Sequence, residues 1–352
     1  MTLETSLRDG AHARLALLFS LAAVSALSAC GGSDDAPAPA PAPAPQALTC
    51  DDTMKAAFKP DANTTVLVVK SFKAGDPIAL SGTTGTPPVA AKDLCFVKLN
   101  VGPGNPGAAS APSTSPGIGM EIWLPAPANW NQKIHNMGGG GWAGGANYQS
   151  TTLIATTGNA ATAANEGSVV GATDTGHSIG NGSFAMNPDG TINSTLWQDF
   201  SERSLHELAL KTKALTAAYY LQTQKFAYWD GCSTGGRQGY KIIQNHPDDY
   251  NGYLVGAPAF NWTKFITAEL YPQIVYQRDL GGVALTTAQQ QQVSAKAVSA
   301  CDVVGGQHLG YVLDPQQCAY DPTRDASVLC AGTVGVPVVN TPVWNAVDWF
   351  ML

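Results

Sequence analysis

The 352-residue chain is long enough for one large or two ordinary domains, and its 44% hydrophobic content is normal for a globular protein. Only 13% of its residues are charged, which is a low share. The net charge of −7 and the lack of any basic patch argue against a nucleic-acid partner.

Residues 1–30 have the pattern of a lipoprotein-type signal peptide. Arg8 and Arg14 supply positive charge, and the apolar run 15–27 is too short to span a bilayer. The run ends in LSAC, which resembles the lipobox of bacterial lipoproteins, so we expect Cys30 to be acylated after cleavage. Ordinary secretion with cleavage nearby is the alternative.

Residues 31–48 predict a linker, because five Ala-Pro pairs between 36 and 45 favour polyproline II and cannot build a core. At about 3.1 Å per residue the repeat would reach roughly 30 Å and hold a domain clear of a membrane surface. An exported chain can keep disulfides. Apart from Cys30 there are six cysteines, whose spacing does not decide their pairing or suggest zinc.

Residues 49–259 alternate strand and helix patterns, which predicts an α/β fold with a doubly wound, mostly parallel sheet. The core candidates in the helix predicted at 197–222 are Leu205, Leu208, Ala209, Leu215 and Tyr219. The second predicted helix covers 236–245. The expected strands are 64–71, 94–99, 118–124, 133–137, 168–172, 225–229 and 253–258.

Residues 260–352 predict part of an inserted lid, helical at first and loop-like beyond Cys301. Aromatic residues are frequent at its start and could pack against an aromatic ligand, although a role in the core is the favoured alternative. They are Phe260, Trp262, Phe265 and Tyr271.

The sequence GCSTG at 231–235 matches G-x-S-x-G, the turn that presents a nucleophilic serine between a strand and a helix. A short aromatic-rich segment, 225–229, precedes it, and the predicted helix follows it. Small residues on both sides allow strand and helix to pass closely. Ser233 is therefore the candidate nucleophile.

A glycine run at 138–141 directly follows a predicted strand. Glycine N–H groups at such a place can stabilise a developing oxyanion. The expected donors are Thr234, after the serine, and Gly139 or Gly140. A flexible linker is the alternative interpretation of the run.

The general base is harder to predict. In this class of hydrolase the acid and the histidine follow the serine, and only His246 and His308 do so here. His246 ends the helix of the elbow and is expected to cap carbonyls, while His308 lies in the lid. His177 could line the site but precedes Ser233. No triad can be completed from these residues.

Several segments together resemble the tannase and feruloyl esterase family, which includes aromatic polyester monomer hydrolases. The resemblance covers about residues 49–330 and is most specific at GCSTGGRQG, 231–239; it extends to 136–145, 173–177, 197–206 and 256–259. It implies an α/β-hydrolase with a large lid that cleaves esters of phenolic or aromatic acids.

The resemblance also implies the disulfides Cys50–Cys95 and Cys301–Cys318. Cys232 would pair with a cysteine beside a catalytic histidine that lies, with the acid, beyond the lid. We therefore expect a truncated chain in which Cys232 and Cys330 lack their partners and apolar surface is exposed.

The family lid carries a calcium loop, but the matching segment 301–310 keeps only Asp302 as a carboxylate. Calcium takes six to eight oxygen ligands, so we expect no metal and no other cofactor. The sequence thus predicts a serine esterase of small aromatic esters that is exported and tethered to a bacterial membrane, with this chain a truncated, weakly active or inactive form. The alternative is a non-catalytic surface lipoprotein that binds aromatic ligands.

Overall fold

The computed structural model describes residues 45–153, 157–278 and 281–328. Contacts divide the chain into the units Met1–Ala44 and Pro45–Leu352. The predicted signal peptide, Cys30 and most of the predicted linker lie outside the described residues, as does Cys330. None of the helices in the described ranges is long and apolar enough to cross a membrane.

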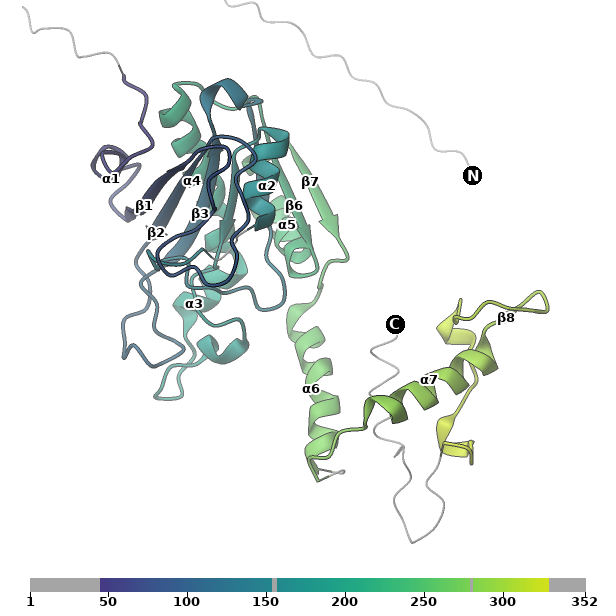
Figure 1. Ribbon diagram of the computed structural model, residues 1–352. Helices are drawn as coiled ribbons and strands as arrows, with labels where there is room; N and C mark the ends of the chain where they lie inside the picture. The colour runs from purple at the N-terminus through teal and green to yellow at the C-terminus, as the bar shows by residue number, and fades with distance from the viewer. Residues whose placement is uncertain (1–44, 154–156, 279–280, 329–352) are drawn as a thin grey trace, which may run out of the picture. The chain divides into compact units, whose positions relative to one another are not determined.

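The N-terminal strands form an antiparallel meander (Figure 1). After the short helix α1 (Met54–Ala57) come β1 (Thr64–Phe72), β2 (Leu94–Val101) and β3 (Ile118–Pro125). They pair in this order, and β3 also pairs antiparallel with β5 (Val170–Thr173). The loops that join β1 to β2 and β2 to β3 contain no helix and so cannot supply the crossover that parallel pairing needs.

The second half of the sheet is parallel. β6 (Phe226–Cys232) lies between β4 (Lys133–Met137) and β7 (Gly252–Gly256). The two halves join where the His135 N–H donates to the Val169 carbonyl at 2.8 Å and the Val169 N–H donates to that of Lys133 at 2.9 Å. The sheet order is β1-β2-β3-β5-β4-β6-β7, parallel from β5 onward. The predicted α/β architecture is therefore present, and its parallel pairing is confined to this second half.

Helices cover the sheet on two faces, as the alternation of side chains along β3 shows. Ile122 and Leu124 pack in one cluster with residues of α4 (Ser204–Tyr220) and α5 (Thr234–Asn245). Trp123, between them, packs in a second cluster with α2 (Thr157–Glu166). Because successive side chains of a strand point to opposite faces, α2 lies on one face and α4 with α5 on the other.

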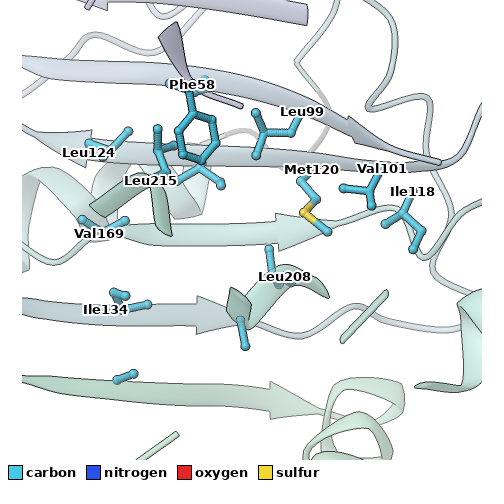
Figure 2. Close-up of a cluster of buried hydrophobic side chains, with 14 of the residues drawn as sticks. Phe58, Leu99, Val101, Ile118, Met120, Leu124, Ile134, Val169, Leu208 and Leu215 are labelled. Carbon is cyan, nitrogen blue, oxygen red and sulfur yellow. The ribbon is translucent and has the colours of Figure 1, made fainter. Parts of the chain in front are cut away.

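The largest core cluster joins β2, β3 and α4 (Figure 2). All four aliphatic core candidates of the predicted helix are at most 1% exposed, whereas Tyr219 is half-buried beside them. That predicted helix is divided into α3 (Ser194–Gln198), a π-turn at Asp199–Arg203, and α4. Single-turn 3-10 helices occupy Pro127–Asn129, Gly182–Ala185, Pro247–Asp249, Pro315–Gln317 and Pro322–Arg324.

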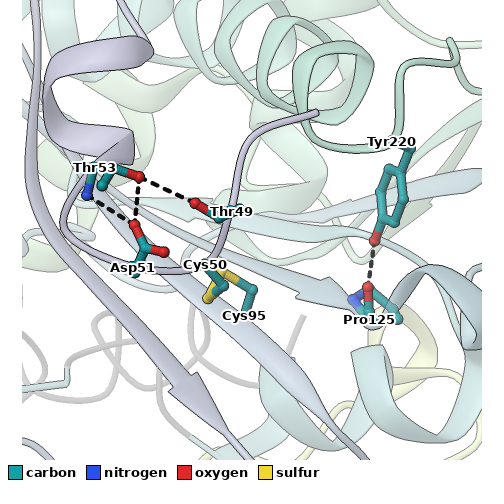
Figure 3. Close-up of a disulfide and its surroundings, with 7 residues drawn as sticks. All are labelled: Thr49, Cys50, Asp51, Thr53, Cys95, Pro125 and Tyr220. Atoms are coloured by element: carbon teal, nitrogen blue, oxygen red, sulfur yellow. Dashed lines mark hydrogen bonds between the residues drawn. A yellow bond between two sulfur atoms is a disulfide. The ribbon is translucent and has the colours of Figure 1, made fainter. Parts of the chain in front are cut away.

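A disulfide fastens the segment before α1 to the sheet (Figure 3). Cys50 bonds to Cys95 of β2, and the turn that follows is closed by the Thr53 N–H, which donates to Asp51 at 2.9 Å. At the end of β3, the Tyr220 hydroxyl donates to the Pro125 carbonyl at 2.6 Å. The disulfide thus ties the segment before α1 to β2, and the hydrogen bond ties the end of α4 to the end of β3.

The segment predicted as a lid contains α6 (Trp262–Arg278) and α7 (Thr287–Cys301). A capping box between Thr286 and Gln289 begins α7. After it come the two-residue strands β8 (Val303–Val304) and β9 (Gln307–His308), and the disulfide Cys301–Cys318 closes this region. Both disulfide pairs that the resemblance implies are thus present.

One face of the parallel half is open within the described residues. A groove of about 620 Å³ runs along it, lined among others by Lys133, Tyr228 and Leu254, which is 65% exposed. In the groove, His135 contacts Glu166 at 2.9 Å and Asp230 at 3.5 Å.

Candidate active site

Ser233 occupies the sharp turn between β6 and α5. Its backbone has φ 59° and ψ −118°, a conformation that costs energy for any residue except glycine. The turn is held from β7 and the segment after it: the Ser233 N–H donates to Gly256 at 3.0 Å, and the Ala259 N–H donates to the Ser233 carbonyl at 3.1 Å. Ser233 itself is exposed. This is the geometry of a nucleophile elbow.

Glycines make the elbow sterically possible. A Cβ at Gly231 would overlap the backbone of Gly235, and a Cβ at Gly236 would overlap the carbonyl of Gly256. A third close approach brings Gly235 against the backbone of Gly138, the first residue of the glycine run. The small residues of the motif thus allow α5, β7 and the glycine run to meet around Ser233.

The glycine run is tied to the elbow rather than free, which argues against a flexible linker. The Gly138 N–H donates to the Asp230 carbonyl at 2.7 Å, and the Thr234 hydroxyl donates to the carbonyl of Gly141. A Cβ at Gly140 would meet nothing within 4 Å, so this residue faces open space.

The two expected donors of the run differ in their environment. The Gly139 N–H donates to Oε1 of Gln238 at 2.9 Å, from one helical turn beyond the elbow. Among the described residues the Gly140 N–H has no acceptor. The Thr234 N–H is at the first position of α5, where the helix itself offers no acceptor. Gly140 and Thr234 are therefore the pair with N–H groups available to an oxyanion.

His177 is bonded to the segment that follows the glycine run. Its Nε2 donates to the Trp142 carbonyl at 2.9 Å, while its own carbonyl accepts from the Gly145 N–H at 3.1 Å. The ring stacks on Phe184 with centroids 4.0 Å apart and is only 1% exposed. Burial lowers the pKa of His177, so the ring is neutral. It is a buried residue whose Nε2 is already engaged by the Trp142 carbonyl.

Asp174 holds the same loop at its other end. Its carboxyl group accepts from the N–H groups of Gly119 at 2.8 Å and Gly176 at 2.9 Å, and it lies beside Asn147, since a Cβ on Gly119 would meet both side chains. Burial raises the pKa of Asp174 well above its usual range. Residues 174 and 177 thus fix the segment 142–147, a role that the sequence did not indicate.

The remaining described histidines lie elsewhere. His246 ends α5, a 12-residue helix that begins just after Ser233, so about 18 Å of helix separates the two. Its ring stacks on His206 at 3.9 Å and contacts Glu202 at 3.2 Å, while His206 contacts Asp249 at 2.8 Å. As expected, His246 caps α5: its backbone N–H donates to the Ile242 carbonyl at 2.7 Å.

His206, His246 and Asp249 form the one group of three potential metal ligands found among the described residues. The two imidazole planes are within 14° of parallel, so their in-plane lone pairs cannot converge on one ion. Both rings are instead engaged by carboxylates that join the π-turn and α4 to the end of α5.

The loop 301–310, which is described throughout, does not fit a calcium ion. Asp302 accepts from Nδ1 of His308 at 2.6 Å and from the Gly310 N–H at 2.9 Å, and these bonds lower its pKa. No second carboxylate follows in residues 303–310. One occupied carboxylate does not fit the oxygen-rich shell that calcium requires. His308, the lid histidine that follows Ser233 in the chain, is therefore hydrogen-bonded to Asp302.

An aromatic cluster joins the glycine run to the lid. Trp142 packs against Trp262 at 5.0 Å and against Phe200 at 5.7 Å. Arg237, one turn after Ser233, lies 4.6 Å from the Phe200 ring and 5.2 Å from that of Trp262. Burial lowers the pKa of Arg237 to about 10. Trp262 is thus partly core.

The other lid aromatics are more exposed. Phe260 is 50% exposed and packs on Tyr240, while Phe265 and Tyr271 are 41% and 39% exposed. Cys232, directly before the nucleophile, is a free and exposed thiol. Its expected partner is not among the described cysteines, since the other four are bonded to each other.

The sequence is similar to those of proteins whose family is known. Residues 105–341 match the family model described as tannase and feruloyl esterase. Feruloyl esterase B of Aspergillus niger is 32% identical over 279 residues, which cover 77% of this chain and 47% of the relative. A protein of Arthroderma benhamiae named "Probable feruloyl esterase" is 36% identical over 206 residues, 58% of this chain and 36% of the relative.

Solved structures agree. The crystal structure of feruloyl esterase B from Aspergillus oryzae superposes with a TM-score of 0.64 at 27% identity, covering 85% of this chain and 55% of that one. The tannin acyl hydrolase from Aspergillus niger, at 23% identity and a TM-score of 0.53, shows the same fold. The chain spans less than half the length of the two curated relatives from Arthroderma benhamiae and Aspergillus niger. With its elbow, its glycine run and this match over residues 105–341, the chain belongs to the tannase and feruloyl esterase family.

Proposed function

We propose that this chain carries the nucleophile and oxyanion hole of a serine ester hydrolase that cleaves esters of phenolic or aromatic acids. The observation that carries the proposal is the strained backbone of Ser233, φ 59°, exposed at the strand-to-helix turn beside a glycine run. The feruloyl esterases among its relatives support the substrate class.

In the proposed reaction, Oγ of Ser233 attacks the ester carbonyl and its proton passes through a general base to the departing alcohol. The N–H groups of Thr234 and Gly140 stabilise the oxyanion. The N–H group of Gly139 instead bonds to Gln238 and so holds the glycine run against α5. Water then hydrolyses the acyl-enzyme and returns the proton to Ser233.

The base and its acid partner are proposed to come from outside the described residues. Each of the five described histidines is bonded elsewhere: His135, His177, His206, His246 and His308. A serine elbow without a described base favours the second candidate function, non-catalytic binding of aromatic ligands.

Hydrolysis of methyl ferulate and methyl gallate by the purified chain, beside Ser233→Ala, tests the proposal. Turnover that the substitution abolishes supports it, and turnover that persists contradicts the role of Ser233. Labelling by an aryl fluorophosphonate, located by mass spectrometry, reports serine activation separately. A folded chain with neither turnover nor labelling supports the binding function.

We also propose that the protein is exported and tethered through Cys30. Two disulfides support an oxidising compartment. Expression with labelled palmitate tests the tether: label in the membrane fraction should disappear in Cys30→Ser. Label that survives the substitution would exclude acylation at this residue.

A further inference from the structure

A second groove, of about 590 Å³, lies beside the loop that joins β2 to β3. One wall is this loop, residues 103–116, which contributes four prolines. The other wall contains Tyr148 and Ile179. Neither the sequence motifs nor the proposed reaction assigns a role to this groove.

The proline-rich wall is held in one conformation. Asn105 and Ser115 exchange both backbone hydrogen bonds at 2.8 Å. The side-chain amides of Asn105 and Asn193 both donate to the carbonyl of Ser113, at 2.7 and 3.0 Å. Arg203 donates to the Gly102 carbonyl at 2.6 Å. A ligand therefore meets a wall that is already ordered, which lowers the entropic cost of binding.

The opposite wall is continuous with the proposed active site. Ile179 follows His177 by two residues, and its carbonyl would be 2.8 Å from a Cβ placed on Gly144. Tyr148 follows Asn147, and a Cβ on Gly119 would meet Asp174, Asn147 and the Tyr148 backbone together. The segments that fix the glycine run thus also form this side of the groove.

The lining selects for an uncharged ligand with flat faces. It includes no acidic, basic or amide side chain. Carboxylates and amides provide the paired donors and acceptors that suit adjacent sugar hydroxyls, so a polyol would find few partners here. Proline rings and the Tyr148 ring offer flat apolar surfaces of the kind on which aromatic rings pack. The hydroxyl group of Ser178 is in the lining for a phenolic O–H group, whereas that of Ser115 is already bonded to Gly117.

We propose that this groove binds an uncharged phenolic ring, separately from the ester bound at Ser233. In a substrate with several rings it would hold a ring remote from the scissile bond. That use as a subsite rests on the proposed esterase function, but the binding does not.

Chemical-shift mapping of the full chain, labelled at isoleucine δ-methyl groups, tests the site directly. Methyl gallate should shift the Ile179 signal in a saturable manner through the ring current, with a dissociation constant on the order of 1 mM. The Ile179 signal is identified by its loss in Ile179→Val. Ile134, which is 1% exposed, is the internal control and should not move.

Two comparisons make the result specific. Tyr148→Ala should weaken the saturation of the Ile179 shift by about two- to tenfold, the range expected for one aromatic contact. The matched control Tyr311→Ala, at an exposed tyrosine outside the groove, should leave it unchanged. If Tyr148→Ala unfolds, Tyr148→Leu, which keeps apolar bulk and the Ile179 probe but removes the ring, replaces it and should weaken the saturation in the same way.

The proposal is overturned if the Ile179 signal does not move, or if methyl glucoside moves it as much as methyl gallate does. Equal shifts from the gallate anion would contradict selection for an uncharged ring. Ser233→Ala should bind methyl gallate in the groove like the unaltered chain. A lack of hydrolysis therefore affects the proposed function alone.

Discussion

The imidazole of His177 donates to the carbonyl of Trp142 at 2.9 Å, 35 residues earlier in the chain. This bond connects the turn after β5 to the loop that carries the glycine run. A histidine that looks available for catalysis in the sequence is thereby used to hold the candidate oxyanion loop.

Replacing His177 tests this support. His177→Phe keeps a ring against Phe184 but leaves the Trp142 carbonyl without its donor, which should lower the free energy of unfolding by about 1–3 kcal/mol. His177→Gln keeps an N–H donor and should lose less. Urea unfolding followed by tryptophan fluorescence measures both. Equal losses in the two variants would show that the hydrogen bond contributes little.

The buried carboxyl of Asp174 should make stability depend on pH. Because burial raises its pKa in the folded state, Asp174 contributes stability at low pH that is lost as the pH rises through the raised pKa. The Asp174→Asn variant has no titratable group at this position. The unfolding free energy of the unaltered chain should therefore fall relative to this variant above about pH 4, near the ordinary aspartate pKa.

Urea unfolding at several pH values between about 4 and about 8 measures this difference. Asp189→Asn is the control: Asp189 is exposed, and hydrogen bonds from Thr191 lower its pKa. The difference in unfolding free energy between Asp189→Asn and the unaltered chain should not change with pH above about pH 5, because Asp189 is then ionised in both the folded and the unfolded chain. A flat profile for Asp174→Asn as well would contradict the raised pKa.

Lys98 and Glu121 form an ion pair at 2.8 Å, directly opposite each other on β2 and β3, and both side chains are fully buried. Lys98→Met should lower the unfolding free energy by about 3–5 kcal/mol, because it leaves a buried charge without its counter-ion. The double variant Lys98→Met/Glu121→Leu should recover much of this loss. A double variant no more stable than Lys98→Met would show that the glutamate is stabilised by other groups.

Gly231 and Gly158 form a matched pair of glycines. A methyl group at Gly231 would overlap the backbone of Gly235, so Gly231→Ala should shift the elbow, lower stability by about 1–3 kcal/mol and remove any Ser233-dependent turnover. Gly158, in the first turn of α2, has open space around it. Gly158→Ala should leave stability unchanged or raise it by up to about 1 kcal/mol. Thermal unfolding and fluorophosphonate labelling measure the two effects.

Local patterns predicted most elements because their signals are local. The β-branched run at 64–71 ends one residue before β1 does, and the aromatic strand predicted at 225–229 begins one residue before β6 but ends three residues short of its end. Helix α2 was missed because its buried face consists of small residues, Ala160, Ala163 and Ala164. Only its packing against β3 and β5 reveals that these alanines belong to the core.

The π-turn at Asp199–Arg203 escaped prediction for a related reason. The apolar spacing from 197 to 222 suits one continuous helix, but Asp199 pairs with Arg203 at 2.5 Å inside the turn. Arg203 in turn donates to Gly102, 101 residues away. A contact at such a distance leaves no periodic signal in the sequence.

The sequence by itself determined the elbow and the family, and with them the candidate nucleophile, because a strained serine between close-packed strand and helix needs specific small residues next to it. Only the tertiary structure decided which groups are available to act on a substrate. Gln238 takes the Gly139 N–H across 99 residues, and four of the five described histidines have partners at least 31 residues away. Hydrogen-bond donors and acceptors are assigned by folding, since a polar group that leaves water bonds to whatever partner the packed chain brings within reach.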